Sequence, residues 1–225
     1  AETARRHGAI GAINGDFFNY ADYSTGGVAV GEGRRWRDTE DQRHTAQLVT
    51  DGKIATIVPP RIILEPEKWM TQVVSGHPIL VLDGKHVETK DAVVLERHPR
   101  TAIGLSRNKR TLILLVVDGR RSSSVGMTGE EMAKTLIKLG AWSALNLDGG
   151  GSSTMYVKGK GVLNSPSDGR ERVVANHLGV FASKRRGTIR GTVVDEATGK
   201  PVAGVRVKAG GQTAVTGRGG RFRLY

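Results

Sequence analysis

The sequence contains no cysteine, few aromatic residues and no long hydrophobic run. Without cysteine there is no disulfide, no thiol nucleophile and no Cys-ligated zinc. The six histidines lack metal-ligand spacings such as His-Glu-x-x-His, so we expect neither a metal site nor another cofactor. No apolar stretch approaches the roughly 20 residues of a membrane span, so we expect no transmembrane segment. Residues 1–7 have no apolar core and do not form a signal peptide.

The net charge of +12 is concentrated in the C-terminal part of the chain. From Lys184 onward, ten Lys and Arg residues accompany two acidic residues, whereas residues 1–183 carry only +4. The basic residues of this main part are scattered, and no aromatic stacking surface accompanies them, so we expect no specific nucleic-acid binding. The basic tail is expected to associate weakly with anionic polymers.

Short apolar segments separated by Asp-Gly and other turns predict a strand-rich protein. Thr128 and Glu131 have the spacing of a capping box, which predicts a helix over residues 129–139 with Met132, Leu136 and Leu139 on one face. Residues 112–117 are apolar at every position, which favours a central strand covered on both faces. The predicted fold class is α+β, with a mixed, largely antiparallel sheet and flanking helices. The predicted strands are residues 9–13, 47–50, 54–58, 79–82, 86–88, 101–105, 111–117, 141–147, 154–157 and 173–181.

Two domains are predicted from a change in composition near residue 183. Residues 2–7 read as the last turn of a helix that Gly8 ends, so the first domain, residues 1–182, is expected to lack its N-terminal part. The segment Ser183-Lys184-Arg185-Arg186 is the predicted linker. Residues 187–225 are β-branched runs with intervening glycines, and they are too few for a complete β-sandwich.

The strongest functional signal is Asn146-Leu147-Asp148 followed by Gly149, Gly150, Gly151, Ser152 and Ser153. An apolar strand delivers a carboxylate to its end, and three consecutive glycines follow, which are costly to order. A tight hairpin needs only one or two glycines, so we favour a functional site over a simple turn. We expect the glycine N–H groups and the serine hydroxyls to form a nest for phosphate or another oxyanion.

Two further segments place charged groups at strand ends. Asp118, in Val117-Asp118-Gly119-Arg120, follows a buried strand, and its carboxylate could meet Asp148 in one cleft; an ordinary Asp-Gly turn is an equal alternative. Arg100 lies at the entrance of the next predicted strand, where a guanidinium group can clamp a phosphate; alone, it would more often be a surface arginine.

Two polar segments complete the set of candidate residues. Asn14 and Asp16 end a short strand and are backed by Phe17 and Phe18, while Arg172 and Asn176 supply a second guanidinium group and a further amide. These four side chains, with Thr101 and the glycine-serine turn of residues 149–153, are the candidate substrate-binding residues. Neither serine has a Gly-x-Ser-x-Gly elbow or an obvious histidine partner.

The ordered set of these motifs resembles the phosphodiester glycosidase family over about residues 8–182. The segment from Leu147 to Ser153 carries most of the resemblance. The family usually has Asn-Gly-Gly-Phe-Phe where this chain has Asp16, and a glycine or similar small residue at the position of His77. The C-terminal segment looks like the start of a carboxypeptidase regulatory-like β-sandwich, a module typical of extracytoplasmic proteins.

The resemblance implies hydrolysis of a sugar-1-phosphodiester in glycan or cell-envelope polysaccharide metabolism, by a secreted or envelope-associated protein. It implies that Arg100 and the turn Gly149–Gly151 hold the phosphate, while Asp148 and Asp118 serve as nucleophile or base and as transition-state stabiliser. Two alternatives stay open. One is a phosphodiesterase that cleaves the P–O bond, and the other is a polysaccharide-binding protein without catalysis.

Overall fold

A computed structural model describes residues 1–36, 46–59, 66–182, 188–209 and 212–224. The chain forms two compact units, Ala1–Phe181 and Ala182–Tyr225. The predicted linker, residues 183–186, lies outside the described residues. None of the helices in the described ranges has the length and apolar character of a membrane span.

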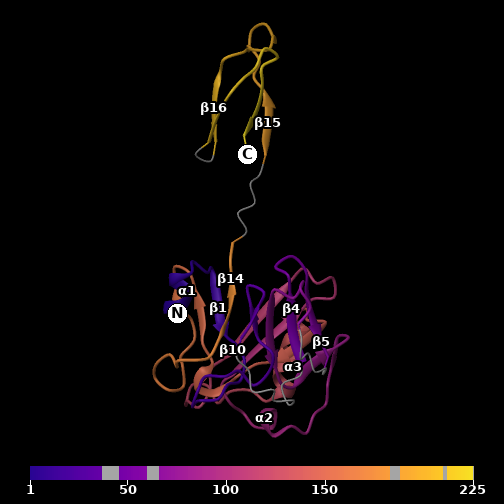
Figure 1. Cartoon of the computed structure of the whole chain (residues 1–225), viewed down its shortest axis with the longest axis vertical. Coiled ribbons are helices and arrows are strands. Elements are labelled where there is room, and N and C mark those ends of the chain that lie inside the picture. Colours follow the sequence, from indigo (N-terminus) through magenta and orange to yellow (C-terminus); the bar gives the residue numbers. More distant parts are fainter. Residues whose placement is uncertain (37–45, 60–65, 183–187, 210–211, 225) are drawn as a thin grey trace. The chain divides into compact units, whose positions relative to one another are not determined.

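Three sheets make up the first unit (Figure 1). The first sheet, in spatial order, contains β13 (Gly161–Val162), β12 (Met155–Val157), β1 (Gly11–Asn14) and β14 (His177–Val180). The second contains β10 (Leu112–Val117), β9 (Arg100–Leu105), β11 (Ser143–Asn146), β7 (Ile79–Leu82) and β8 (Lys85–His86). The third contains β3 (Arg34–Arg35), β2 (Val30–Gly31), β6 (Gln72–Gly76), β4 (Ala46–Thr50) and β5 (Ala55–Val58).

The sheets are antiparallel rather than mixed. Every pair of neighbouring strands in the described ranges runs antiparallel, which corrects the expectation of a mixed sheet. Short turns connect β4 to β5, β7 to β8 and β9 to β10, and such connections join antiparallel strands directly. Helices are few: α1 (Glu2–Arg6), α2 (Ala92–Leu95), α3 (Gly129–Lys138) and a single 3₁₀ turn, η2 (Gly150–Ser152).

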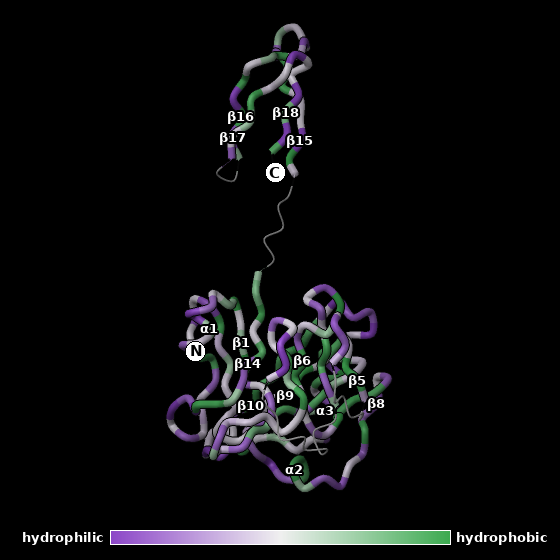
Figure 2. Tube along the Cα trace, in the orientation of Figure 1, coloured by the Kyte–Doolittle hydropathy of each residue, from purple (hydrophilic) through white to green (hydrophobic). Residues whose placement is uncertain are grey.

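The core lies between the sheets. One cluster joins all three of them and includes Ile13, Leu48, Ile103 and Leu145. A second cluster packs α3 against the other face of the β9–β11–β7 strands. Figure 2 shows the corresponding pattern, with hydrophobic residues following the strands and hydrophilic residues the loops. The ends of β1 and β11, which carry candidate site residues, therefore rest on a continuous apolar core.

Strand β10 differs from its prediction, because it lies at the edge of its sheet. Its side chains do pack on both faces, with Leu114 and Val116 against one core cluster and Ile113 and Leu115 against the other. Each of these residues is only partly buried. Two apolar faces identify a strand that is covered above and below, but they do not indicate whether it has neighbours on both sides.

Helix α3 begins as predicted. The hydroxyl of Thr128 accepts a hydrogen bond from the N–H of Glu131, and the Glu131 carboxylate accepts one from the N–H of Thr128. Met132 and Leu136 are fully buried, whereas Leu139, expected on the same face, is 55 % exposed. Leu139 is the C-cap, and the helix ends there, before Gly140 with φ +96°.

The second unit contains two antiparallel pairs of strands. Strand β15 (Ile189–Thr192) pairs with β18 (Arg221–Leu224), and β16 (Arg206–Ala209) pairs with β17 (Gln212–Val215). Most of its residues are exposed, although Thr216 and Leu224 are each 4 % exposed. The incomplete β-sandwich and its regulatory-like character stay predictions.

Candidate functional site

The candidate site is organised by the side chain of Asn14, at the end of β1. Its amide Nδ2 donates to the main-chain oxygen of Asp148 at 2.7 Å. Its Oδ1 accepts from the hydroxyl of Thr101 at 2.7 Å and from the N–H of Thr154 at 3.2 Å. Asn14 is 2 % exposed. One amide therefore joins strand β1, strand β9 and both sides of the glycine turn.

Asp148 lies directly after strand β11, where the sequence places it. Its Oδ1 accepts from the N–H of Gly149 at 2.9 Å, and its carboxylate also accepts a hydrogen bond from the side chain of Ser152. Burial raises the pKa of Asp148, while these two hydrogen bonds and the charge of Arg172 act in the opposite direction. A partly desolvated carboxylate held in this way is suited to act as nucleophile or base.

The glycine turn does not form the phosphate nest that the sequence suggests. The N–H of Gly149 is bound to Asp148, and the N–H of Gly150 donates to the main-chain oxygen of Pro99 at 2.9 Å. Only the N–H of Gly151 has no hydrogen-bond partner among the described residues. Two of the three predicted amide donors are therefore already used inside the protein.

Close packing explains why the turn requires glycine. A Cβ atom at Gly149 would lie 2.9 Å from the Pro99 oxygen, and one at Gly151 would lie 2.1 Å from the Arg172 guanidinium group. Gly150 has φ +59°, a conformation that side chains disfavour. Tight contacts within the protein and the φ of Gly150 therefore explain the need for three glycines.

Arg100 is placed differently from its expected role as a phosphate clamp. It is 3 % exposed, and its guanidinium group donates to three main-chain oxygens: Nε to Met127, Nη1 to Val93 and Nη2 to Glu96. Val93 belongs to α2, and Glu96 is its C-cap. Arg100 therefore attaches α2 to strand β9.

Two other arginines flank the turn. The guanidinium group of Arg172 donates to the Asp168 carboxylate through Nε and Nη2, and to the hydroxyls of Tyr20 and Ser152 through Nη1. On the Gly150 side, Arg120 lies 3.3 Å from the position that a Cβ atom would take. No hydrogen bond or ion pair of the Arg120 side chain is found within the described ranges.

Arg120 is the residue that sequence reasoning missed. It follows Asp118-Gly119 and therefore lies in a motif that had already been singled out. Its backbone has φ +59°, an unfavourable conformation for a residue with a side chain and one found often at functional sites. The residue type and the position at a strand end were visible in the sequence, but the approach of its side chain to Gly150 was not.

The carboxylate of Asp118 is linked to the glycine turn through the side chain of Asn164. Its Oδ1 accepts from the N–H of Ser165 at 2.8 Å and from Nδ2 of Asn164 at 3.3 Å. The same Nδ2 donates to the main-chain oxygen of Ser153 at 2.9 Å. Asp118 is thus connected to the turn, although its carboxylate is used in part to order the loop at residues 164–165.

Asp16 and Asn176 form a pair of reciprocal hydrogen bonds. The N–H of Asp16 donates to Oδ1 of Asn176 at 2.9 Å, and Nδ2 of Asn176 donates to Oδ1 of Asp16 at 3.1 Å. The N–H of Ser75 donates to Oδ2 of Asp16 at 3.1 Å. Asp16 is 2 % exposed, so it orders the site from within and is not available to contact a substrate directly.

Three predicted residues, Asn14, Ser152 and Arg172, line a hollow of about 320 Å³ together with Thr154 and His177. Ser153 is 1 % exposed, and its hydroxyl has no hydrogen-bond partner among the described residues. His77, where the family usually has a small residue, is hydrogen-bonded to Asp91, the N-cap of α2. In the described ranges, no group of three or more His, Asp or Glu side chains is placed to hold a metal ion.

Comparison with known proteins shows the family to which the chain belongs. The profile of the phosphodiester glycosidase family matches residues 7–181, nearly the whole first unit. The chain belongs to this family. Asn14, Asp148, Arg172 and the other candidate residues all lie within the part that matches, whereas the second unit lies outside it.

Three relatives of this phosphodiester glycosidase domain show the extent of the similarity. Bovine N-acetylglucosamine-1-phosphodiester alpha-N-acetylglucosaminidase is 32% identical over 184 residues, which cover 74% of this chain and 34% of the bovine one. A SPbeta prophage-derived protein of Bacillus subtilis is 45% identical over 82 residues, covering 36% of this chain and 12% of that protein. The catalytic domain of the zebrafish N-acetylglucosamine-1-phosphodiester alpha-N-acetylglucosaminidase superposes with a TM-score of 0.65 at 24% identity, over 80% of this chain and 66% of that one. The chain thus spans about a third of the bovine protein's length.

Proposed function

We propose that the first unit hydrolyses a glycosyl phosphodiester, releasing the sugar and leaving a phosphomonoester. The observation that carries this proposal is the glycine turn itself: it begins at a half-buried carboxylate, Asp148, and has the guanidinium groups of Arg120 and Arg172 beside Gly150 and Gly151. Membership of the phosphodiester glycosidase family supports the same class of reaction.

The substrate's single negative charge would be held by the two arginines, with the N–H of Gly151 as a further donor. Arg172 is already oriented by Asp168, so little side-chain entropy would be lost on binding. Arg120 has no such partner in the described ranges and would supply the more mobile contact. Arg100 takes no part in this contact, because its donors are directed at main-chain oxygens.

Asp148 would act at the anomeric carbon as nucleophile or as base for a water molecule. Phosphate is a good leaving group, so the departing oxygen needs little protonation. Charge develops on the phosphate oxygens as the C–O bond breaks, and the arginines stabilise it. Asp118, linked to the turn through Asn164, is the candidate for stabilising the oxocarbenium-like transition state.

Hydrolysis in ¹⁸O-labelled water tests which bond breaks. C–O cleavage places the label in the released sugar, whereas label in the phosphate would show that the protein is a phosphodiesterase. Binding of a glycan without release of sugar from a nitrophenyl or nucleotide-linked sugar would indicate a polysaccharide-binding protein. Asp148→Asn should abolish turnover and leave the circular dichroism spectrum unchanged; a folded, active variant would remove Asp148 from the mechanism.

We further propose that the substrate belongs to an exopolysaccharide or another cell-envelope glycan and that the protein works outside the cytoplasm. The likeness of the C-terminal segment to modules of extracytoplasmic proteins supports this location. Fractionation of the native source tests it: the protein should be found in the medium or the envelope fraction. Its recovery in the cytoplasmic fraction alone would contradict the proposal.

A further inference from the structure

The buried carboxyl group of Asp16 belongs to a segment that is hydrogen-bonded to Asp148. The N–H of Asp148 donates to the main-chain oxygen of Gly15 at 3.2 Å, so the residue before Asp16 is bonded directly to Asp148. Asn14 completes the connection through its bond to the Asp148 oxygen. These bonds join the ends of β1 and β11 beside both acids, of which Asp16 is buried and Asp148 is half-buried.

The surroundings of Asp16 provide uncharged partners only. Its oxygens accept from the N–H of Ser75 and from the amide of Asn176. No lysine, arginine or histidine in the described ranges forms a hydrogen bond or ion pair with it. The negative charge of Asp148 raises the pKa of Asp16, whereas the positive charge of Arg172 lowers the pKa of Asp148. A negative charge on Asp16 would therefore be buried and uncompensated, whereas one on Asp148 would not.

We propose that Asp16 is a positioning residue for the reaction: Asp16 and Asp148 form a carboxyl pair that carries one negative charge, with the proton on Asp16 and the charge on Asp148. For its effect on turnover, this inference rests on the proposed function. The pair keeps Asp148 ionised at the glycine turn. Because Asp16 stays protonated, no second negative charge forms near a substrate that is itself an anion.

The energetics of the two groups support this assignment. Burial raises the pKa of Asp16 to about 8, and the charge of Asp148 adds to the effect. The pKa of Asp148 is also raised by burial, but hydrogen bonds from Ser152 and Gly149 and the charge of Arg172 oppose that rise. Asp148 therefore ionises first, and loss of the second proton requires the buried Asp16 carboxylate to be charged while Asp148 is charged as well.

A direct titration tests the pair without any substrate. The full chain is labelled with ¹³C at aspartate carboxyl carbons and followed by NMR, and Asp16→Asn identifies the Asp16 signal. We expect a midpoint near pH 8, which Asp148→Asn should lower because it removes the neighbouring charge. A midpoint near the ordinary value for aspartate, or one unaffected by Asp148→Asn, would overturn the proposal.

The pH dependence of kcat/KM tests the consequence for catalysis, since it reports groups of the free enzyme. In the unchanged protein kcat/KM should fall above pH 8 by about tenfold per pH unit, whereas Asp16→Asn, which cannot ionise, should remove this decline. Asp83→Asn, in an exposed turn with φ +50°, is the matched control and should keep it. An equal decline in Asp16→Asn would refute the inference. Absence of hydrolysis at every pH would instead refute the proposed function, and the NMR titration would still decide the state of the pair.

Discussion

Asn14 contributes hydrogen bonds to three partners from a fully buried position, so its loss should affect stability and activity together. Asn14→Ala would leave the Asp148 oxygen, the Thr101 hydroxyl and the Thr154 N–H without this partner. Each unsatisfied buried group costs about 1–3 kcal/mol, so urea denaturation should show a loss of at least that size. The exposed Asn108→Ala is the control and should lose less. Equal losses of unfolding free energy in the two variants would show that the hydrogen bonds of Asn14 do not stabilise the site.

Asp16 should also make stability depend on pH. In the unfolded chain its carboxyl loses its proton near the ordinary pKa of 3.8, but in the folded chain it keeps the proton up to about pH 8. Between these pH values Asp16 carries a proton in the folded chain but not in the unfolded chain. The free energy of unfolding therefore falls as pH rises from about 4 to 8, and above pH 8 Asp16 causes no further change. Asp16→Asn should remove this slope, which urea denaturation at pH 5 and pH 8 will measure. Parallel pH profiles for the two proteins would show that Asp16 is not buried as a neutral acid.

For single residues, the sequence identified several side chains that are hydrogen-bonded to one another in the candidate site, but not all of their roles. Asn14 and Asp148 are predicted as polar groups at strand ends and Asn176 as a further amide; the structure bonds Asn14 to Asp148 and Asn176 to Asp16. The assignment of phosphate binding to Arg100 did not agree with the geometry. A sequence shows that a guanidinium group is present, but not which carbonyl oxygens the fold will place around it. That information comes from α2, which is 4 residues long and was not predicted.

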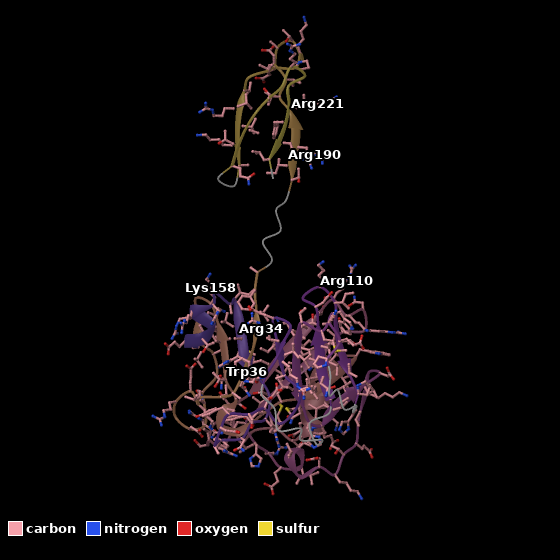
Figure 3. All side chains as sticks on the ribbon, in the orientation of Figure 1. Arg34, Trp36, Arg110, Lys158, Arg190 and Arg221 are labelled. Carbon is pink, nitrogen blue, oxygen red and sulfur yellow. The ribbon has the colours of Figure 1, made fainter. Side chains whose placement is uncertain are left out.

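Helix α2 is attached to strand β9 through the side chain of Arg100, so a substitution at Arg100 tests how this element is held. Arg100→Lys keeps the positive charge but cannot donate to three carbonyl oxygens at once. The variant should be less stable by about 1–3 kcal/mol, and amide hydrogen exchange should accelerate in residues 92–96. Arg110→Lys, at the surface in Figure 3, is the matched control and should change neither property. Unchanged exchange in α2 would contradict the supporting role of Arg100.

The glycine turn offers a second test of an element. Gly151→Ala would place a methyl group 2.1 Å from the Arg172 guanidinium group and 2.2 Å from the Asp168 carboxylate, so this ion pair would have to move. We expect kcat/KM to fall by at least about tenfold, given how strongly misplacement of a binding group affects catalysis. Gly217→Ala meets nothing within 4 Å and serves as control. An unchanged kcat/KM in Gly151→Ala would show that the position of Arg172 does not matter.

Local chemistry predicted the start of α3 correctly, because a capping box depends only on residues three apart. It failed for β10, whose edge position depends on the order of strands from distant parts of the chain. The three separate sheets could not be predicted for the same reason. Periodicity indicates which faces are apolar, whereas the choice of neighbour is made by packing over long sequence distances.

For the whole molecule, the division into two units predicts that catalysis and binding to anionic polymers can be separated. All of the candidate site residues lie in Ala1–Phe181. In the second unit, Arg190 lies directly opposite Arg223 across the β15–β18 pair, and Arg221 lies on β18 as well (Figure 3). A chain ending at residue 182 should therefore keep its kcat/KM and elute from heparin at lower salt than the full chain. Loss of activity on truncation would show that the second unit contributes to catalysis.

The route of the chain out of the first unit has a mechanical consequence. Strand β14 directly follows Asn176 and is the last strand before the second unit, and its register on β1 places His177 opposite Asn14. Tension applied to the chain beyond residue 182 would load the hydrogen bonds of the β1–β14 pair first, at the end opposite the site. Detachment would then proceed along the pair toward Asn14, so a pulling force strong enough to remove β14 would also dismantle the site.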